Sequence, residues 1–148
     1  MTNRQIEAAA KAILRAAGAE SAEVWERTPE RFASAWQEIL SGYSRDDELK
    51  QILTTFEKEG AQQLVAMHNI SFFSVCEHHL LPFFGRASVG YIPGERILGA
   101  SKLIRLVDIF SKRLQLQERL TTQIADALEE HLKAVGVAVV LEGEHFCM

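Results

Sequence analysis

The sequence predicts an α+β fold in which an N-terminal helical segment precedes an antiparallel β-β-α-α-β unit with its helices on one face. Up to Gly60 the apolar residues recur at helical spacing, whereas beyond it they gather in runs enriched in β-branched and aromatic residues. Two strand-like runs, two helical stretches and a final apolar run then follow in that order. We therefore expect the helical segment to cover residues 1–60 and the α+β domain to cover residues 61–148.

Three helices are expected in the N-terminal segment. The first covers Gln5–Ala17, which is rich in alanine and carries an apolar stripe at helical spacing. The second should begin at Thr28–Pro29, because threonine caps a first turn well and proline fits the first helical position. It should end at Ser41–Gly42, and a more polar third helix should cover Asp46–Lys58.

Three strands and two helices are expected in the second part. The β-branched and aromatic content predicts strands over Gln62–Val75 and Phe84–Ile92. Ser101 is a credible N-cap for a helix that ends near Arg113. A longer helix should cover Leu116–Ala134, and a short apolar strand should cover Val137–Leu141.

Composition excludes several classes of protein. The chain has 148 residues, of which 47% are apolar, as expected for one globular domain with a small helical appendage. A net charge of −4 and the absence of a basic run argue against nucleic-acid binding. No apolar run approaches the ~20 residues that span a bilayer, and the first residues do not resemble a secretory signal. We therefore expect a cytoplasmic protein.

The most informative motifs are a Cys-Glu-His-His run at residues 76–79 and a His-x-Cys run at residues 145–147. They contain both cysteines of the chain and three of its five histidines. The first spacing lets a thiolate and an imidazole from one turn bind the same metal, and the second puts both side chains on one face of a strand. Three ligands of this kind leave a fourth tetrahedral position for water, as in a catalytic zinc site. The candidate ligands are Cys76, His79 and Cys147.

Two imidazoles are left beside this site, those of His78 and His145, and imidazoles move protons near neutral pH. The cysteines also have simpler interpretations, as inert buried thiols or as one disulfide. Two cysteines are too few for a disulfide scaffold. Each of them lies within three residues of a histidine, which favours the metal site.

Two further clusters carry charge. Ser101, Lys102 and Arg105 place a hydroxyl and two cations in the first turns of a helix, where the unpaired amides already favour an anion. A solvated pair of surface charges explains them equally well. Glu118, near the start of the next helix, is favoured there by the helix dipole without any ligand.

Taken together, these residues resemble GTP cyclohydrolase I in order and spacing from about Thr28 onward. The matching segments are Thr28–Pro29 with Arg31, Cys76–His79, Gly85, Tyr91–Pro93, Gly99, Ser101–Lys102, Arg105, Gln117–Thr121, His145 and Cys147. The combination is highly specific.

The resemblance implies the tunnelling fold and assembly into a homo-oligomer, in this family a decamer of two stacked pentamers with active sites at subunit interfaces. It also implies a reaction, the first step of folate and pterin biosynthesis. Hydrolytic attack on C8 of GTP releases formate, and recyclisation then gives 7,8-dihydroneopterin triphosphate. Residues 61–148 would form the catalytic domain.

The resemblance also implies a role for each matching residue. The ligands of a Zn²⁺ cofactor would be Cys76, His79 and Cys147. The catalytic histidines would be His78 and His145. The substrate-binding residues would be Glu118 and Gln117 at the guanine, and Lys102, Arg105, Ser101 and Arg31 at the triphosphate.

The family continues after the His-x-Cys motif with an Arg-Gly pair, a further strand and a C-terminal helix. We therefore expect this chain to lack the last strand of the tunnelling fold and the triphosphate-binding arginine, either as a truncated form of a longer chain or as a naturally short homologue. Three hypotheses stay open. The chain is a zinc-dependent GTP cyclohydrolase, a non-catalytic homologue that binds a purine or pterin nucleotide without turnover, or an enzyme acting on another purine or pterin.

Overall fold

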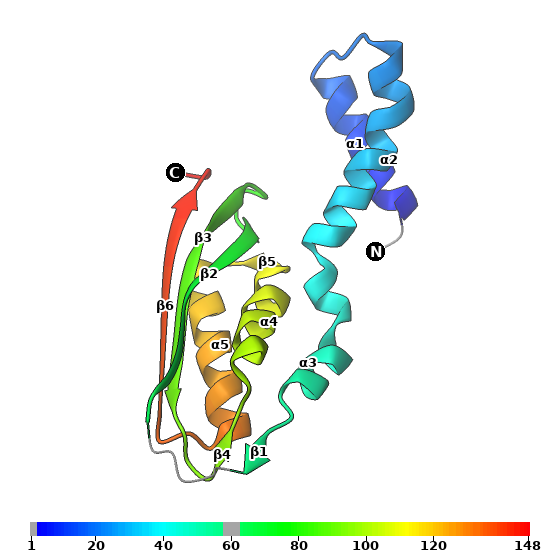
Figure 1. The fold of residues 1–148 in the computed structure, drawn as a ribbon. Coiled ribbons are helices and arrows are strands. Elements are labelled where there is room, and N and C mark those ends of the chain that lie inside the picture. Colours follow the sequence, from blue (N-terminus) through cyan, green and yellow to red (C-terminus); the bar gives the residue numbers. More distant parts are fainter. Residues whose placement is uncertain (1–2, 58–62) are drawn as a thin grey trace. The chain divides into compact units, whose positions relative to one another are not determined.

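The computed structural model describes residues 3–57 and 63–148, and the chain divides into two units, Met1–Leu40 and Ser41–Met148. The first unit holds two helices, and the strands of the described residues all belong to the second (Figure 1). The α+β class predicted from the sequence is confirmed. The boundary predicted at residue 60 lies outside the described residues. In the part of the chain that the structure describes, no helix is both long and apolar enough to cross a membrane.

The N-terminal unit consists of α1 (Asn3–Ala16) and α2 (Ala22–Ile39), which pack against each other. The small side chains of Ala10 and Ala33 are buried, and small residues let two helices approach closely. The helix predicted over Gln5–Ala17 is confirmed to within two residues.

The predicted start of the second helix is wrong. α2 begins at Ala22, and Pro29 lies in its interior instead of at its first position. Trp25 accounts for the earlier start, because its indole donates a hydrogen bond to the backbone oxygen of Ala19 (2.7 Å) and lies under the guanidinium of Arg15. The segment before Pro29 is thereby anchored to the end of α1. The helix continues past Pro29 although proline has no backbone N–H to donate to the preceding turn.

The second unit begins with three short elements. These are the 3-10 helix η1 (Ser41–Ser44), α3 (Asp46–Ile52) and β1 (Phe56–Glu57), which pairs with β4 (Arg96–Ile97). The predicted third helix is correct at its start and too long at its end. The hydroxyl of Thr54 donates to the backbone oxygen of Gln51 (2.7 Å), and the chain leaves the helix there. The predicted end at Lys58 lies outside the described residues.

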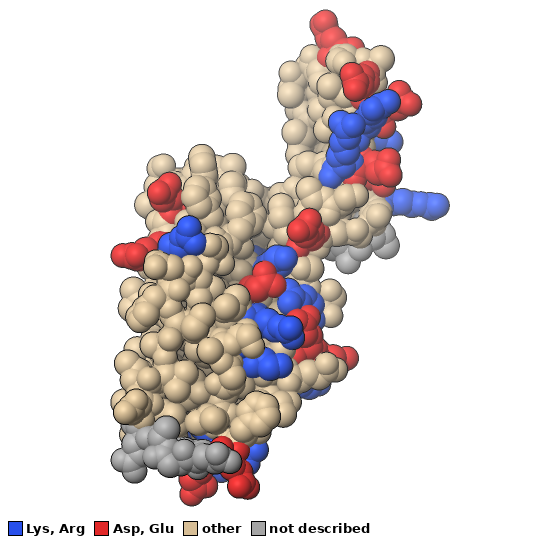
Figure 2. Space-filling model, viewed as in Figure 1, with Lys and Arg blue, Asp and Glu red and all other residues tan. Residues whose placement is uncertain are grey.

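Arg45 fixes α3 against a longer helix, α4 (Ala100–Ser111). Its Nη1 donates to Asp108 of α4 (2.6 Å), and its Nε donates to Glu48 of α3 (2.7 Å). The hydrogen bond from Arg45 lowers the pKa of the Glu48 carboxyl, and the two acidic partners raise the pKa of Arg45. Figure 2 shows acidic and basic side chains intermingled over this part of the second unit.

The main sheet has four strands in the order β5-β2-β3-β6. Their bounds are β2 (Val65–Cys76), β3 (Pro82–Ile92), β5 (Leu114–Gln115) and β6 (Gly136–His145). β3 is antiparallel to both β2 and β6, whereas the short β5 lies parallel to the end of β2. Both long helices, α4 and α5 (Gln117–Leu132), cover the same face of this sheet (Figure 1). The predicted β-β-α-α-β order and its one-sided helical layer are confirmed, while the assignment to the tunnelling fold stays a prediction.

The predicted N-cap of α4 is wrong. Gly99, not Ser101, is the last extended residue, and the backbone N–H of Lys102 donates to its oxygen (2.8 Å). Ser101 is an exposed residue of the first turn. The earlier start follows from Leu98, which is buried and held in place, so that the chain can turn into the helix directly after it.

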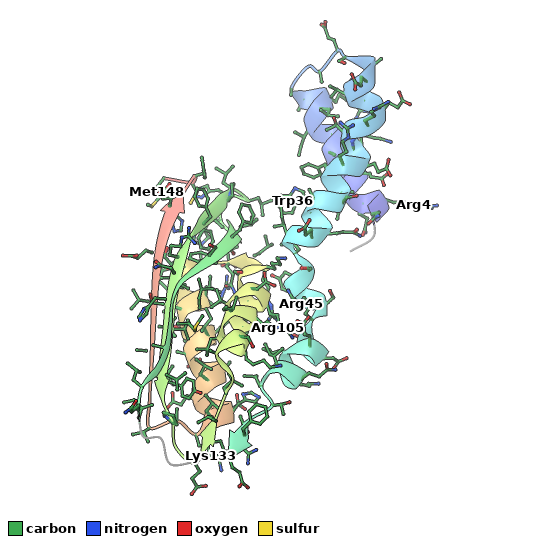
Figure 3. The ribbon with its side chains drawn as sticks, viewed as in Figure 1. Arg4, Trp36, Arg45, Arg105, Lys133 and Met148 are labelled. Carbon is green, nitrogen blue, oxygen red and sulfur yellow. The ribbon has the colours of Figure 1, made fainter. Side chains whose placement is uncertain are left out.

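Leu98 is held by the hydroxyl of Tyr91, a fully buried side chain of β3. The hydroxyl donates to the Leu98 oxygen (2.8 Å) and accepts from the Leu98 N–H (2.7 Å). Burial raises the pKa of Tyr91, so the phenol is neutral over the physiological range. Around it, apolar side chains of the sheet, α4 and α5 fill the space between the two layers (Figure 3). One hydroxyl therefore satisfies both backbone groups at the loop that starts α4.

We expect Tyr91→Phe to destabilise the second unit by about 1–3 kcal/mol, because both buried backbone groups of Leu98 would lose their partner. Urea unfolding followed by circular dichroism measures this, whereas tryptophan fluorescence reports only the N-terminal unit, which holds Trp25 and Trp36. Tyr43→Phe is the matched control, because the Tyr43 hydroxyl accepts a comparable hydrogen bond from Leu114 at an exposed position. Equal losses of unfolding free energy in Tyr91→Phe and Tyr43→Phe would contradict the prediction.

Candidate metal centre

The candidate metal centre begins in the loop between β2 and β3. Cys76 is the last residue of β2, and the turn that follows carries His79. The Cys76 N–H donates to the Leu81 oxygen (2.8 Å), and the Leu80 N–H donates to the Cys76 oxygen (2.9 Å). Leu80 has a φ of +54°, a strained conformation for a branched side chain that these hydrogen bonds maintain. The loop is therefore a shaped turn that holds two potential ligands.

The third ligand reaches the loop through the pairing of β3 with β6. Phe83 lies opposite His145 in the register, and the N–H of Phe146 donates to the Pro82 oxygen (3.1 Å). β6 ends at His145, so Cys147 lies in a turn. The expectation that both residues of the His-x-Cys motif lie on one face of a strand is wrong, because the strand ends between them. Cys147 Sγ nonetheless lies 3.7 Å from His145 Nδ1.

These three residues form a cluster that fits zinc. The ligand atoms of Cys76, His79 and Cys147 all lie within 4.8 Å of one another. Zn–S bonds of about 2.3 Å and Zn–N bonds of about 2.0 Å put tetrahedral ligand atoms roughly 3.5–4 Å apart, so small side-chain rotations complete the site. Both cysteines are free thiols, and soft thiolates with one imidazole are typical zinc ligands. Because Cys76 is buried and His79 exposed, the cluster opens to solvent on the imidazole side.

The surroundings of Cys147 affect the ionisation of its thiol. Burial raises the pKa of the Cys147 thiol, and the neighbouring Cys76 raises it further through a hydrogen bond and charge repulsion. The protonated form of the Cys147 thiol is therefore favoured until a cation neutralises its thiolate. Binding of a divalent metal here is expected to release protons.

His145 is oriented by two neighbours. Its ring stacks on Phe83 with the centroids 4.6 Å apart and an angle of 6° between the planes. Gln117 of α5 donates from Nε2 to the Leu141 oxygen (3.1 Å), so its Oε1 faces His145 Nε2 at 2.9 Å. An amide oxygen can only accept, so His145 carries its proton on Nε2 and turns Nδ1 towards Cys147.

A pocket of about 570 Å³ joins these groups. It is lined by Cys76, His78, His79, Gln115, Leu116, Gln117, Glu118, Gly143, His145, Cys147 and Met148. A second hollow of about 520 Å³, lined by Arg86, Glu142 and Glu144 among others, holds neither thiol nor imidazole. We therefore assign the chemistry to the first pocket, which contains seven of the eleven residues singled out from the sequence.

Three residues predicted to bind an anion lie elsewhere in this chain. Ser101, Lys102 and Arg105 belong to the first half of α4, whose far end leads through β5 to the end of β2. At 1.5 Å per residue, Lys102 lies about 14 Å along the axis from the end of α4 that adjoins the pocket. Figure 3 accordingly shows Arg105 beside α3 and well away from Met148. Arg31, on α2, belongs to the other unit.

Residues to which the sequence assigned no role help to build the pocket. Gln115 is a buried polar side chain on β5, and Gly143 lies where a Cβ would come within 2.7 Å of Gln117 Oε1. Phe83 supplies the aromatic face under His145. No spacing in the sequence marks them, because each acts on a partner that is distant along the chain.

Comparison with known proteins identifies close relatives of this chain. The profile of a family described as GTP cyclohydrolase I matches residues 6–148. GTP cyclohydrolase 1 of Deinococcus radiodurans is 54% identical over 125 residues, which are 83% of this chain and 56% of the relative. GTP cyclohydrolase 1 of Wolinella succinogenes is 49% identical over 122 residues, which are 82% of this chain and 64% of the relative. GTP cyclohydrolase 1 of Brucella canis is 47% identical over 146 residues, which are 97% of this chain and 68% of the relative. The chain thus spans less than two thirds of the length of the first two.

We expect Gly143→Ala to displace Gln117 and release His145, because the added Cβ would overlap Gln117 Oε1. Long-range ¹H–¹⁵N NMR of the imidazole nitrogens should then show a mixture of His145 tautomers instead of the Nε2–H form alone. Gly136→Ala on the same strand is the matched control, since a Cβ there meets its nearest neighbour at an ordinary 4.0 Å. An unchanged His145 spectrum in Gly143→Ala would contradict the assigned role of Gln117.

Proposed function

Since this chain belongs to the GTP cyclohydrolase I family, we propose that it converts GTP to 7,8-dihydroneopterin triphosphate with release of formate, as the first step of folate and pterin biosynthesis. The observation that carries the proposal is the convergence of the two Cys/His motifs on one pocket. Chain segments that are far apart in sequence supply two thiols and three imidazoles to it.

The proposed cofactor is Zn²⁺, held by Cys76, His79 and Cys147. Zinc in such a site lowers the pKa of bound water to about 7 and so provides a nucleophile at neutral pH. Two thiolates and one neutral imidazole suit this metal better than magnesium or calcium, which take oxygen ligands. Free thiols used as ligands suit a reducing cytoplasm, the compartment that we propose.

The proton transfers are assigned to the remaining two histidines. His78 is exposed at the rim, with its ring centroid 6.3 Å from that of His79, so it can exchange protons with solvent beside the metal. His145 is held rigidly by Phe83 and Gln117, which suits a group that must act at one defined atom of the substrate. An exposed and a fixed imidazole therefore flank the site.

Recognition of guanine is assigned to Glu118, with Gln117 beside it. Glu118 is an exposed residue at the first turn of α5 that lines the pocket. Its carboxylate can accept two parallel hydrogen bonds from guanine N1–H and the exocyclic amine, a pattern that adenine lacks. The start of α5 also favours an acidic side chain, so the guanine anchor and the helix dipole do not conflict.

The triphosphate is assigned to Lys102, Arg105 and Ser101, together with Arg31. A helix start that carries two cations suits a ligand with about four negative charges. Because Ser101, Lys102 and Arg105 lie roughly 9–15 Å along α4 from the end adjoining the pocket, we propose that a neighbouring copy of the chain supplies them. The active site would then be shared between subunits of a homo-oligomer, which in this family is a decamer.

The metal and the proton carrier can be separated by mutation. Cys76→Ala should lose zinc and GTP turnover together, whereas His78→Ala should keep zinc and lose about 10²–10⁴-fold in turnover. Metal analysis and pterin fluorescence on the same preparations measure both, with His68→Ala as a control that removes an exposed imidazole outside the pocket. Zinc-loaded wild-type protein that binds GTP without forming formate or pterin would indicate a nucleotide-binding homologue instead.

A shared active site predicts complementation between inactive chains. Glu118→Ala and Lys102→Ala should each be inactive alone, and co-expressed mixtures should recover turnover because some sites receive an intact half from each chain. Mixed assemblies of two different Glu118 variants are the control and should stay inactive. Mixtures of the Glu118 and Lys102 variants without activity would contradict the shared site, while leaving the zinc assignment intact.

A further inference from the structure

Arg119 of α5 contacts the turn that lies between the two first ligands. Its Nη2 bonds the carboxylate of Glu77, the residue directly after Cys76, and its Nε donates to Gln115 Oε1 (3.1 Å). Arg119 does not line the pocket, and its two partners, Glu77 and Gln115, belong to other elements. The guanidinium therefore joins the ligand turn to the helical layer.

Gln115 is a fixed hydrogen-bond partner for this guanidinium. The side chain is only 1% exposed, and its Nε2 donates to the Phe110 oxygen (2.9 Å) and to Gln123 Oε1 (2.8 Å). Its Oε1 is left to accept from Arg119. Because each polar atom of this buried amide has a partner, rotating it would leave a buried group unsatisfied, at a cost of about 1–3 kcal/mol.

Glu77 is thus held from two directions. Its backbone N–H donates to the Gln115 oxygen (3.1 Å), which continues the parallel pairing of Cys76 with Gln115, and its carboxylate is held by Arg119. The ion pair is half-buried, with 40% of the Arg119 side chain and 32% of the Glu77 side chain exposed, so it is screened less than a surface pair. The turn that positions Cys76 relative to His79 is consequently fixed at its middle.

We propose that Arg119 is a positioning residue that preorganises the Cys76 and His79 half of the metal centre through Glu77. The inference rests on the proposed function only for the identity of the metal. A different role for Arg119, as a further cation for the triphosphate, fits poorly because two of its nitrogens are already engaged by Gln115 and Glu77 within the protein. Fixing a ligand turn before the metal arrives lowers the conformational cost of binding.

The first test is zinc affinity, measured by competition with a chromophoric chelator on the full chain. Arg119→Met should bind zinc about 10-fold more weakly, at the lower end of the effect of residues that support metal ligands. Arg96→Met is the matched control, because it removes an arginine that bonds Thr55 at the β1–β4 pair. If circular dichroism shows that Arg119→Met is unfolded, Arg119→Lys replaces it. Lysine keeps the charge but cannot hold both partners in the same geometry, so this variant should show an intermediate loss of zinc affinity.

The second test asks whether Arg119 acts through Glu77. Glu77→Gln should weaken zinc binding to a similar extent, and the double variant Glu77→Gln with Arg119→Met should be little worse than either single variant. Additive losses would assign Arg119 an effect independent of the turn and would overturn the proposal. A rise in KM for GTP at unchanged zinc affinity would instead support the triphosphate role.

The third test needs no metal. In a Cys147→Ser background, the reaction of the buried Cys76 thiol with a disulfide reagent should be several-fold faster in Arg119→Met than in the parent, because the freed turn exposes the thiol. Unchanged reactivity together with unchanged zinc affinity would overturn the proposal. If the wild-type protein does not bind zinc but Cys76 still reacts faster in Arg119→Met than in its parent, the zinc site is refuted and the positioning role is upheld.

Discussion

The register between β3 and β6 is the constraint on which the candidate site depends. With Phe83 opposite His145, the end of β6 lies beside the turn that follows β2, and the two Cys/His motifs meet. The pairing requires a close approach at Gly85, where a Cβ would lie only 1.8 Å from the Glu142 oxygen. A shift of one residue in the β3–β6 register would turn His145 to the opposite face of the sheet and separate the two Cys/His motifs.

Buried and half-buried polar side chains hold the ends of the elements that frame the pocket. The Tyr91 hydroxyl fixes the start of α4, the Gln115 amide ties β5 to α4 and α5, and Gln117 links the start of α5 to β6. Among the described residues, no buried side-chain nitrogen or oxygen lacks a partner. Because a buried polar group is costly to leave unpaired, these contacts specify single positions in a way that apolar packing alone does not.

Charge is divided along the second unit in a way that bears on function. The pocket holds thiols, imidazoles and one carboxylate, whereas Lys102 and Arg105 lie in the first half of α4, away from it. A site for a nucleotide triphosphate needs both the groups in the pocket and the cations of α4. Under the function proposed above, these would be two half-sites, and a second copy of the chain would bring its α4 to the pocket.

The sequence by itself determined the α+β class, the order of the longer strands and helices, and the candidate metal ligands Cys76, His79 and Cys147, because periodicity and short motifs are local properties. It misplaced the starts of α2 and α4, since Trp25 and Leu98 are anchored by contacts to other segments. Only the tertiary structure decided that Gln117 orients His145, that Arg119 supports Glu77, and that the predicted triphosphate residues lie apart from the metal centre. Such relations depend on register and on which helix face meets which strand, and no spacing within one segment encodes them.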